Sequence, residues 1–566
     1  MDSDLYDEFG NYIGPELDSD DDEEIQPVGG NEEEEEQKDD IMEQVNLIVQ
    51  TKNHFHKRRM RKRTENRQLF LAVKLCCTRT RNIMPLPWKW PALLFRRKTI
   101  NVSKCQAQEH LLPETVYKKD FLVDMTNHPE LIRNIAIAGN FHHGKTAFID
   151  CMVEQTHPDF FRYEDRDVRF TDTLFIEQQR GCSIKALPIT LVMQNSRNKS
   201  FLLNIFDTPG HVNFSDECTA AFRLVDGVVI MVDVHEGLMM NTERLLRHAI
   251  QEHLPITICL NKIDRLILEL KLPPADAYAK LKFTLDQINN FVQTFGEDDI
   301  PLFSPLMGNV IFASGRYSIC FSLESFANIY AAKHSQLNAE KFSRRLWGDM
   351  FFDTALKKFT KKPQLGGATP TPRSFVVGDV DTCLPKLQQH LGIKLNKEEQ
   401  RMNVRPLITL ICQRFFGSFT SFVDLVVNNI KSPIENGPRK VQHCYSGDAT
   451  SQLPTELANC SPNGPLYIHT TKNYATQDTT AFHVLGRVFS GTIHSGDEVK
   501  ILGENYSIQD EEDCRVMTVG RLWLPVARYT VEVNSVGAGC LVLMEGIDQP
   551  VTKTCTIVEK DYDQDE

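Results

Sequence analysis

Short apolar runs alternate with amphipathic stretches through the middle of the chain, and this alternation predicts regular secondary structure. Continuous apolar runs are typical of strands buried on both faces, and we expect strands at 134–138, 201–206, 227–233, 256–260 and 309–312. Between them, the segment 241–253 places Leu245, Leu246, Ala249 and Ile250 on one face, as an amphipathic helix does. Strands that alternate with helices predict an α/β fold, a mostly parallel sheet wrapped by helices.

The pattern changes towards the C-terminus. Short runs at 484–489, 498–502 and 530–533 are separated by turns that contain Gly and Asp, and this spacing predicts a small antiparallel β-barrel. We therefore expect two folded domains, an α/β domain with an insertion at 111–455 and a β-barrel domain at 456–566.

Charge sets the N-terminal part apart from these domains. Of the 566 residues, 1–50 contain 19 acidic side chains against Lys38 alone. This balance predicts a disordered acidic tail, which either docks on a basic partner or keeps the protein soluble. Residues 51–110 form a basic segment with the run Lys57–Arg63. That run is typical of a nuclear-import signal or a nucleic-acid patch, although the irregular composition around it also fits translated non-coding sequence.

Cysteine usage and hydropathy argue against two classes of protein. The fifteen cysteines include no Cys-x-x-Cys pair, which disfavours zinc knuckles and a secreted disulfide framework and favours reduced thiols in the cytosol or nucleus. No apolar stretch approaches the roughly 20 residues that a membrane-spanning helix needs. We therefore expect a protein that works without a membrane.

A phosphate-binding loop follows the first predicted strand. It has a glycine, four residues and then Gly-Lys-Thr, and we expect all its residues to contact a nucleotide: Gly139, Asn140, Phe141, His142, His143, Gly144, Lys145 and Thr146. The glycines let the backbone fold around an anion. Lys145 brings a positive charge to the terminal phosphates, and Thr146 can ligate Mg²⁺. The loop alone does not distinguish ATP from GTP.

Three further motifs, each at the end of a predicted strand, narrow the nucleotide to GTP or GDP. In the first (Asp207, Thr208, Pro209 and Gly210), the aspartate can hold Mg²⁺ and the glycine N–H can sense the γ-phosphate. In the second (Asn261, Lys262, Ile263 and Asp264), the last carboxylate can accept two hydrogen bonds that guanine donates and adenine cannot. The third, around Ser314, can offer backbone N–H groups to guanine O6. Ligands of open α/β sheets bind at this strand edge.

Two residues are candidates for the chemistry of hydrolysis. His211 comes directly after the γ-phosphate sensor, and we predict that it positions the attacking water. The segment 177–185 is the expected switch that closes over the metal, and in it Ser183 supplies a hydroxyl. The predicted ligands of Mg²⁺ are therefore Thr146, Ser183 and Asp207.

Together these motifs resemble the large translational GTPases, the ribosome-translocating elongation factors. The resemblance is carried by Asp207–His211, Arg180-Gly181, Asn261–Asp264 and the barrel string Gly486–Ile493. Longer strings resemble a narrower branch, the spliceosomal GTPases of the U5 small nuclear ribonucleoprotein. These strings are Met1–Leu17, Phe141–Lys145, Leu266–Pro274 and Gly503–Tyr506. This resemblance covers residues 1–20 and about 110–560.

The resemblance implies a nuclear GTPase of pre-mRNA splicing, whose nucleotide state governs spliceosome activation and disassembly. The implied partners are small nuclear RNA, an RNA helicase and a large scaffold protein. Two residues depart from the pattern, since His142 stands where elongation factors have an acid and Ser183 replaces the switch threonine. Residues 51–98 match nothing in the branch. Relatives are expected to continue past Glu566 into three further domains, so we expect a truncated chain.

Three alternatives to an active spliceosomal GTPase stay open. The first is a nucleotide-gated scaffold that binds GTP with negligible hydrolysis. The second is a translation elongation factor, and the third is a truncated product without independent activity.

Overall fold

The computed structural model describes residues 113–157, 169–295, 300–333, 338–348, 351–353, 358–360, 369–370, 396, 399, 404–447, 452–476, 480–506 and 513–560. All of them belong to one compact unit, Ile100–Glu566. The expected acidic tail at 1–50 and most of the basic segment at 51–110 lie in the other unit, and both lie outside the described residues.

A parallel sheet forms the centre of the first domain, as the apolar runs predict. Its parallel strands follow the spatial order β3 (Ser200–Asp207), β1 (Ile132–Gly139), β4 (Gly227–Asp233), β5 (Ile256–Asn261) and β6 (Val310–Ser314). Each lies within two residues of its predicted bounds. Two antiparallel strands flank them, β2 (Leu187–Gln194) beside β3 and β7 (Ile319–Phe321) beside β6. The sequence pattern did not predict β2 or β7.

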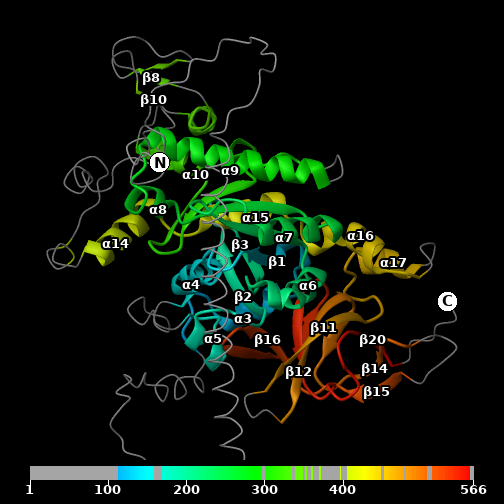
Figure 1. The fold of residues 1–566 in the computed structure, drawn as a ribbon. Coiled ribbons are helices and arrows are strands. Elements are labelled where there is room, and N and C mark those ends of the chain that lie inside the picture. Colours follow the sequence, from blue (N-terminus) through cyan, green and yellow to red (C-terminus); the bar gives the residue numbers. More distant parts are fainter. Residues whose placement is uncertain are drawn as a thin grey trace, which may run out of the picture. The chain divides into compact units, whose positions relative to one another are not determined.

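Helices connect and cover these strands (Figure 1). They are α3 (Lys119–Met125), α4 (Lys145–Thr156), α5 (Phe175–Arg180), α6 (Ser215–Leu224), α7 (Met240–Gln251), α8 (Ile263–Leu268), α9 (Pro274–Phe295), α10 (Leu323–Lys333), α11 (Ala339–Ser343), α14 (Val404–Phe416), α15 (Thr420–Asn429), α16 (Pro433–Cys444) and α17 (Gln452–Ala458). Short 3₁₀ turns are η1 (Pro129–Leu131), η3 (Val212–Phe214) and η4 (Pro305–Met307). The predicted amphipathic helix at 241–253 is α7.

The two faces of the sheet pack against different helices. Along β1, Ile135 and Ile137 belong to one hydrophobic core together with residues of α4 and α15. The alternate residues Ala136 and Ala138 belong to a second core with α6, α7 and α9. Because successive side chains of a strand point to opposite faces, both faces are covered by protein. The ends of the parallel strands carry the loops that are left for ligand binding.

An antiparallel β-strand domain follows, as expected from the C-terminal pattern. Its strands are β11 (Tyr467–Ala475), β12 (Phe482–Ser490), β14 (Glu498–Leu502), β15 (Cys514–Thr518), β16 (Leu522–Val526), β17 (Tyr529–Val533), β19 (Leu541–Met544) and β20 (Cys555–Glu559). A separate ribbon pairs β13 (Thr492–His494) with β18 (Ser535–Gly537). One bridge, Val526 to Ile189, joins β16 to β2 of the first domain. A further small sheet contains β8 (Phe351–Asp353), β9 (Lys358–Thr360) and β10 (Thr369–Pro370).

Within the described ranges, no single helix is long and apolar enough to cross a membrane. One pair bent by 51°, Pro406–Phe416 with Thr420–Asn429, meets the test by length and composition alone. Its second member, α15, contributes Phe422, Val423 and Val426 to the core beneath the sheet.

Candidate functional site

The predicted phosphate loop connects the end of β1 to the start of α4. Gly144 caps α4 with a left-handed backbone (φ 85°). A Cβ on this residue would lie 2.6 Å from Nδ2 of Asn261, so both the backbone angle and the close approach require glycine. Nδ2 of Asn261 donates to the carbonyl oxygen of His143 at 2.8 Å. The second motif therefore holds the first one in place.

Lys145 lies inside this loop. Its Nζ donates to the carbonyl oxygens of Gly139 and Asn140 at 3.0 Å each, and the side chain is buried. Burial lowers the pKa of Lys145, because a charged group loses water on entering the protein. A ligand with negative charge at this position would stabilise the ammonium form.

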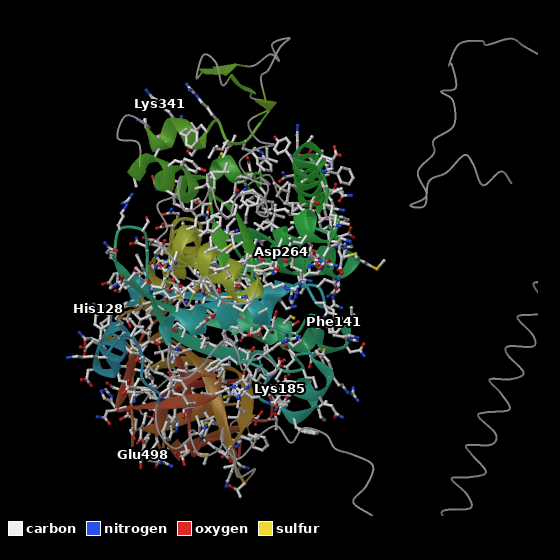
Figure 2. The ribbon with its side chains drawn as sticks, turned by 90° about the vertical axis from the view of Figure 1, so that its left-hand side faces the viewer. His128, Phe141, Lys185, Asp264, Lys341 and Glu498 are labelled. Carbon is white, nitrogen blue, oxygen red and sulfur yellow. The ribbon has the colours of Figure 1, made fainter. Side chains whose placement is uncertain are left out.

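A cavity of about 230 Å³ opens beside the loop. Several of its lining residues come from the predicted motifs: Phe141, His142, Gly144, Lys145, Thr146, Ser183, Gly210 and Lys262. Ala147, Arg169, Gly181 and Cys182 complete the lining. Figure 2 labels Phe141 at this site and Asp264 in the same domain. The structure thus places the phosphate loop, the expected switch and the glycine of the Asp207 motif around one cavity.

Oxygen atoms gather where Mg²⁺ was expected. Oγ1 of Thr146 donates to Oδ2 of Asp207 at 2.8 Å and lies 3.2 Å from Oγ of Ser183. Thr171 donates to the same carboxylate oxygen at 2.5 Å. The other oxygen, Oδ1 of Asp207, is buried without a hydrogen-bond partner among the described residues. Burial raises the pKa of Asp207 to about 6.

This donor set fits Mg²⁺. Magnesium prefers oxygen ligands and binds through one or two carboxylates with hydroxyls, waters and substrate phosphates. An unsatisfied buried carboxylate oxygen is costly, and a cation beside it would remove that cost. In the described part of the chain, no cluster of three or more His, Cys, Asp or Glu side chains could hold a metal. The hydroxyl and carboxylate oxygens of Thr146, Ser183 and Asp207 are ligands of the kind that Mg²⁺ prefers.

The predicted base-recognition residues also lie together. Asp264 is nearly buried and accepts a hydrogen bond from Oγ of Ser314 at 2.6 Å. Oδ1 of Asn261 accepts from the backbone N–H groups of Lys262 and Gly315, at 2.8 and 3.4 Å. A Cβ on Gly315 would lie 3.2 Å from the backbone of Ala147 at the start of α4. The three loops that follow β1, β5 and β6 are therefore packed against one another.

A buried carboxylate organises the expected switch. Glu177 on α5 is fully buried. One of its oxygens accepts from the N–H groups of Ile184 and Lys185, at 2.8 and 3.1 Å, and the other accepts from Leu174 N–H at 2.9 Å. These bonds fold the segment around Ser183. Sequence analysis noted Glu177 as part of the switch and gave it no role, because nothing local shows that a glutamate is buried.

Two histidines occupy positions that the sequence did not specify. His143 is fully buried, with Nδ1 3.0 Å from the carbonyl oxygen of Met231 and Nε2 3.1 Å from Oε2 of Glu236. Its side chain therefore anchors the loop to β4 and does not line the cavity. His211 is exposed, and its Nδ1 accepts from Asn213 N–H at 3.2 Å. Its ring lies 5.8 Å from that of Phe141, edge-on.

Family comparisons agree with this geometry. The family model described as elongation factor Tu GTP binding domain matches residues 130–431, and elongation factor Tu domain 2 matches residues 482–558. A third model, the 116 kDa U5 small nuclear ribonucleoprotein component N-terminus, matches residues 3–76. This last match runs into the basic segment, so the expectation that residues 51–98 match nothing in the branch is wrong for 51–76.

Three curated relatives are similar along the whole chain. The 110 kDa U5 small nuclear ribonucleoprotein component CLO of Arabidopsis thaliana is 39% identical over 593 residues, which cover 100% of this chain and 60% of the relative. The 109 kDa U5 small nuclear ribonucleoprotein component GFL of the same plant is 40% identical over 585 residues, covering 100% and 59%. Pre-mRNA-splicing factor cwf10 of Schizosaccharomyces pombe is 38% identical over 592 residues, covering 100% and 60%. The chain spans about 60% of the length of these relatives.

Proposed function

The chain belongs to the family of elongation factor Tu-type GTP-binding domains, and we propose that it is a magnesium-dependent GTPase of the U5 small nuclear ribonucleoprotein in the nucleus. One observation carries the proposal of a nucleotide switch. The hydroxyls of Thr146 and Ser183 meet beside the carboxylate of Asp207. The phosphate loop, the switch segment and the end of β3 thus meet at the proposed metal site, so loss of the γ-phosphate would affect all three.

Each residue would act on a defined part of the nucleotide. Lys145 would neutralise the β- and γ-phosphates, and the N–H of Gly210 would bind the γ-phosphate. Thr146, Ser183 and Asp207 would hold Mg²⁺, which supplies further positive charge when bound. Asp264, oriented by Ser314, would bind guanine. In hydrolysis a water oxygen bonds to the γ-phosphorus, the bond to the β–γ bridging oxygen breaks, and GDP, phosphate and a proton are released.

We assign the positioning of that water to His211. Replacing it by alanine is expected to lower the single-turnover rate of GTP hydrolysis about 10²-fold or more, because a positioned general base contributes at least that much. Asn213→Ala is the matched control, since it removes an exposed side chain of the same turn and keeps the N–H that His211 accepts. Binding of a fluorescent GTP analogue should be equal in all three proteins.

A scaffold that binds GTP with negligible hydrolysis is the second candidate, and one observation favours it. The ring of His211 is exposed, bonded to its own turn, and absent from the residues that line the cavity. An unchanged rate in His211→Ala would remove the catalytic assignment, and negligible hydrolysis by a wild-type chain that binds GTP would support the scaffold.

Assignment to the spliceosome rests on the relatives, whose names describe U5 components and a pre-mRNA-splicing factor. We propose that this chain joins the same assembly and acts there with a scaffold protein, an RNA helicase and small nuclear RNA to control activation and disassembly. The tagged chain, purified from nuclear extract, is expected to enrich U5 small nuclear RNA over ribosomal RNA by quantitative PCR. Enrichment of ribosomal RNA would instead identify a translation factor.

A further inference from the structure

We propose that Arg169 is a further catalytic residue, supplied by the chain itself, that stabilises the negative charge on the terminal phosphates during hydrolysis. This inference rests on the proposed GTPase function. The sequence motifs did not single out Arg169, which lies ahead of the expected switch.

The position of the guanidinium supports this role. Arg169 lines the same cavity as Lys145, Ser183 and Gly210, the residues proposed to meet the γ-phosphate and its metal. Its Nη2 would lie 3.6 Å from a Cβ on Gly181 in the switch. Burial, followed by the positive charge of Arg169, lowers the pKa of His142 in the phosphate loop. The positive charge of Arg169 therefore acts on the loop that holds the phosphates.

The guanidinium of Arg169 has N–H donors that could bind an anion. Nη1 lies 3.5 Å from Oδ2 of Asp172, longer than a normal hydrogen bond. An arginine carries five N–H donors in a planar fork that matches phosphate oxygens. The side chain of Arg169 is 36% exposed and that of Asp172 is 2% exposed, so the guanidinium compensates a buried carboxylate on one side and is open to the cavity and water on the other. Pairing with Asp172 therefore uses part of the guanidinium, and the N–H donors that remain belong to a side chain that lines the cavity.

Two contacts hold the arginine in position. Asp172 accepts from Oγ of Ser183 at 2.9 Å through its other oxygen, so the arginine is tied to the proposed metal ligand. From the turn between β16 and β17, Arg528 donates to the carbonyl oxygens of Arg169 and Phe170, at 2.8 Å each. Phe170 is fully buried. The backbone at Arg169 is thus anchored on one side by the core and on the other by the β-strand domain.

Such placement suits charge stabilisation in the transition state. As the γ-phosphorus leaves the bridging oxygen and bonds to water, negative charge is spread over the γ-oxygens and the leaving GDP. A guanidinium held before the reaction starts need not reorganise to meet this charge. The expected gain is in the rate of the chemical step and not in GTP affinity.

The test compares Arg169→Ala and Arg169→Lys with wild type in the full 566-residue chain. We expect the single-turnover rate of Arg169→Ala to fall about 10³-fold, with the Kd for a fluorescent GTP analogue unchanged. Lysine should restore part of the rate, since it keeps the charge and loses the fork. Arg197→Ala is the matched control, because Arg197 is an exposed arginine of the turn between β2 and β3, outside both the switch and the cavity lining.

A second readout avoids dependence on turnover. Wild type is expected to bind GDP with aluminium fluoride, which mimics the transition state, and Arg169→Ala is expected to lose that complex while it still binds GDP. Equal hydrolysis and equal complex formation in wild type and Arg169→Ala would overturn the role of Arg169 and leave the GTPase proposal intact. Wild type that binds GTP yet neither hydrolyses it nor forms the complex would overturn both. A defect of Arg197→Ala as large as that of Arg169→Ala would also contradict the proposal.

Discussion

Replacing Arg487 by methionine is expected to destabilise the folded unit by about 3–5 kcal/mol, because it leaves a buried carboxylate without its cation. Arg487 on β12 and Asp226 before β4 are both almost completely buried, and Nη2 lies 2.9 Å from Oδ1. The same carboxylate accepts from Asn134 of β1 and Asn436 of α16, at 2.9 Å each. One ion pair therefore connects the parallel sheet, the helical layer and the β-strand domain.

Urea denaturation of Arg487→Met measures this loss as a lower midpoint. In the double variant with Asp226→Asn, part of the loss should be recovered, since the unpaired charge is removed while one of the two asparagine donors, Asn134 or Asn436, loses its acceptor. Arg521→Met is the matched control, because Arg521 pairs with Glu545 at 2.9 Å on the exposed surface of the same domain, and it should change the midpoint little. Equal midpoints for the single and double variants would show that buried charge is not the cause.

Asp264→Asn is expected to weaken GTP binding on the order of 10⁴-fold and to shift preference to xanthosine triphosphate. A carboxylate accepts from both N1–H and the 2-amino group of guanine, whereas an amide presents one acceptor and one donor. Xanthine keeps N1–H and has a carbonyl oxygen at position 2, so it matches the amide. The bond from Ser314 at 2.6 Å should persist and hold the new side chain in the same orientation.

Competition of both triphosphates against a fluorescent nucleotide measures this change. Asp276→Asn, an exposed aspartate in the first turn of α9, is the control and should keep the preference for GTP. Unchanged GTP affinity in Asp264→Asn would contradict the base assignment. Burial raises the pKa of Asp264, so guanine binding by the carboxylate should weaken on acidification at a higher pH than for an exposed aspartate.

The phosphate loop shows what can be predicted from local sequence alone. The apolar run of β1 and the left-handed φ of Gly144 are properties of a few neighbouring residues, so pattern and composition suffice to predict them. The same holds for β3, β4, β5 and β6, which are continuous apolar runs. The strand β2 was not predicted, although its residues are equally apolar. It pairs antiparallel to β3 and so lies outside the alternation of strand and helix from which the parallel strands were predicted.

Glu177 and Arg169 show what cannot be predicted from local sequence. Acidic and basic side chains are mostly exposed. No neighbouring residue reveals that Glu177 is buried and accepts hydrogen bonds from three backbone N–H groups. Arg169 lines the cavity, and its backbone carbonyl accepts a hydrogen bond from Arg528 of the other domain, 359 residues away in the chain. Contact of the His143 backbone with the nucleotide stays a prediction, and the structure adds that its side chain lies against the carbonyl oxygen of Met231 on β4.

The sequence by itself determined the order along the chain of the five parallel strands, the phosphate loop and the motifs that predict guanine binding, since each depends on residues adjacent in the chain. Only the tertiary structure decided which charged side chains are buried, which oxygens lie beside Asp207, and which arginine lines the cavity. The physical reason is that burial and pairing belong to residues brought together from distant parts of the chain. Arg487 and Asp226 differ from a surface ion pair only because the folded chain buries both side chains.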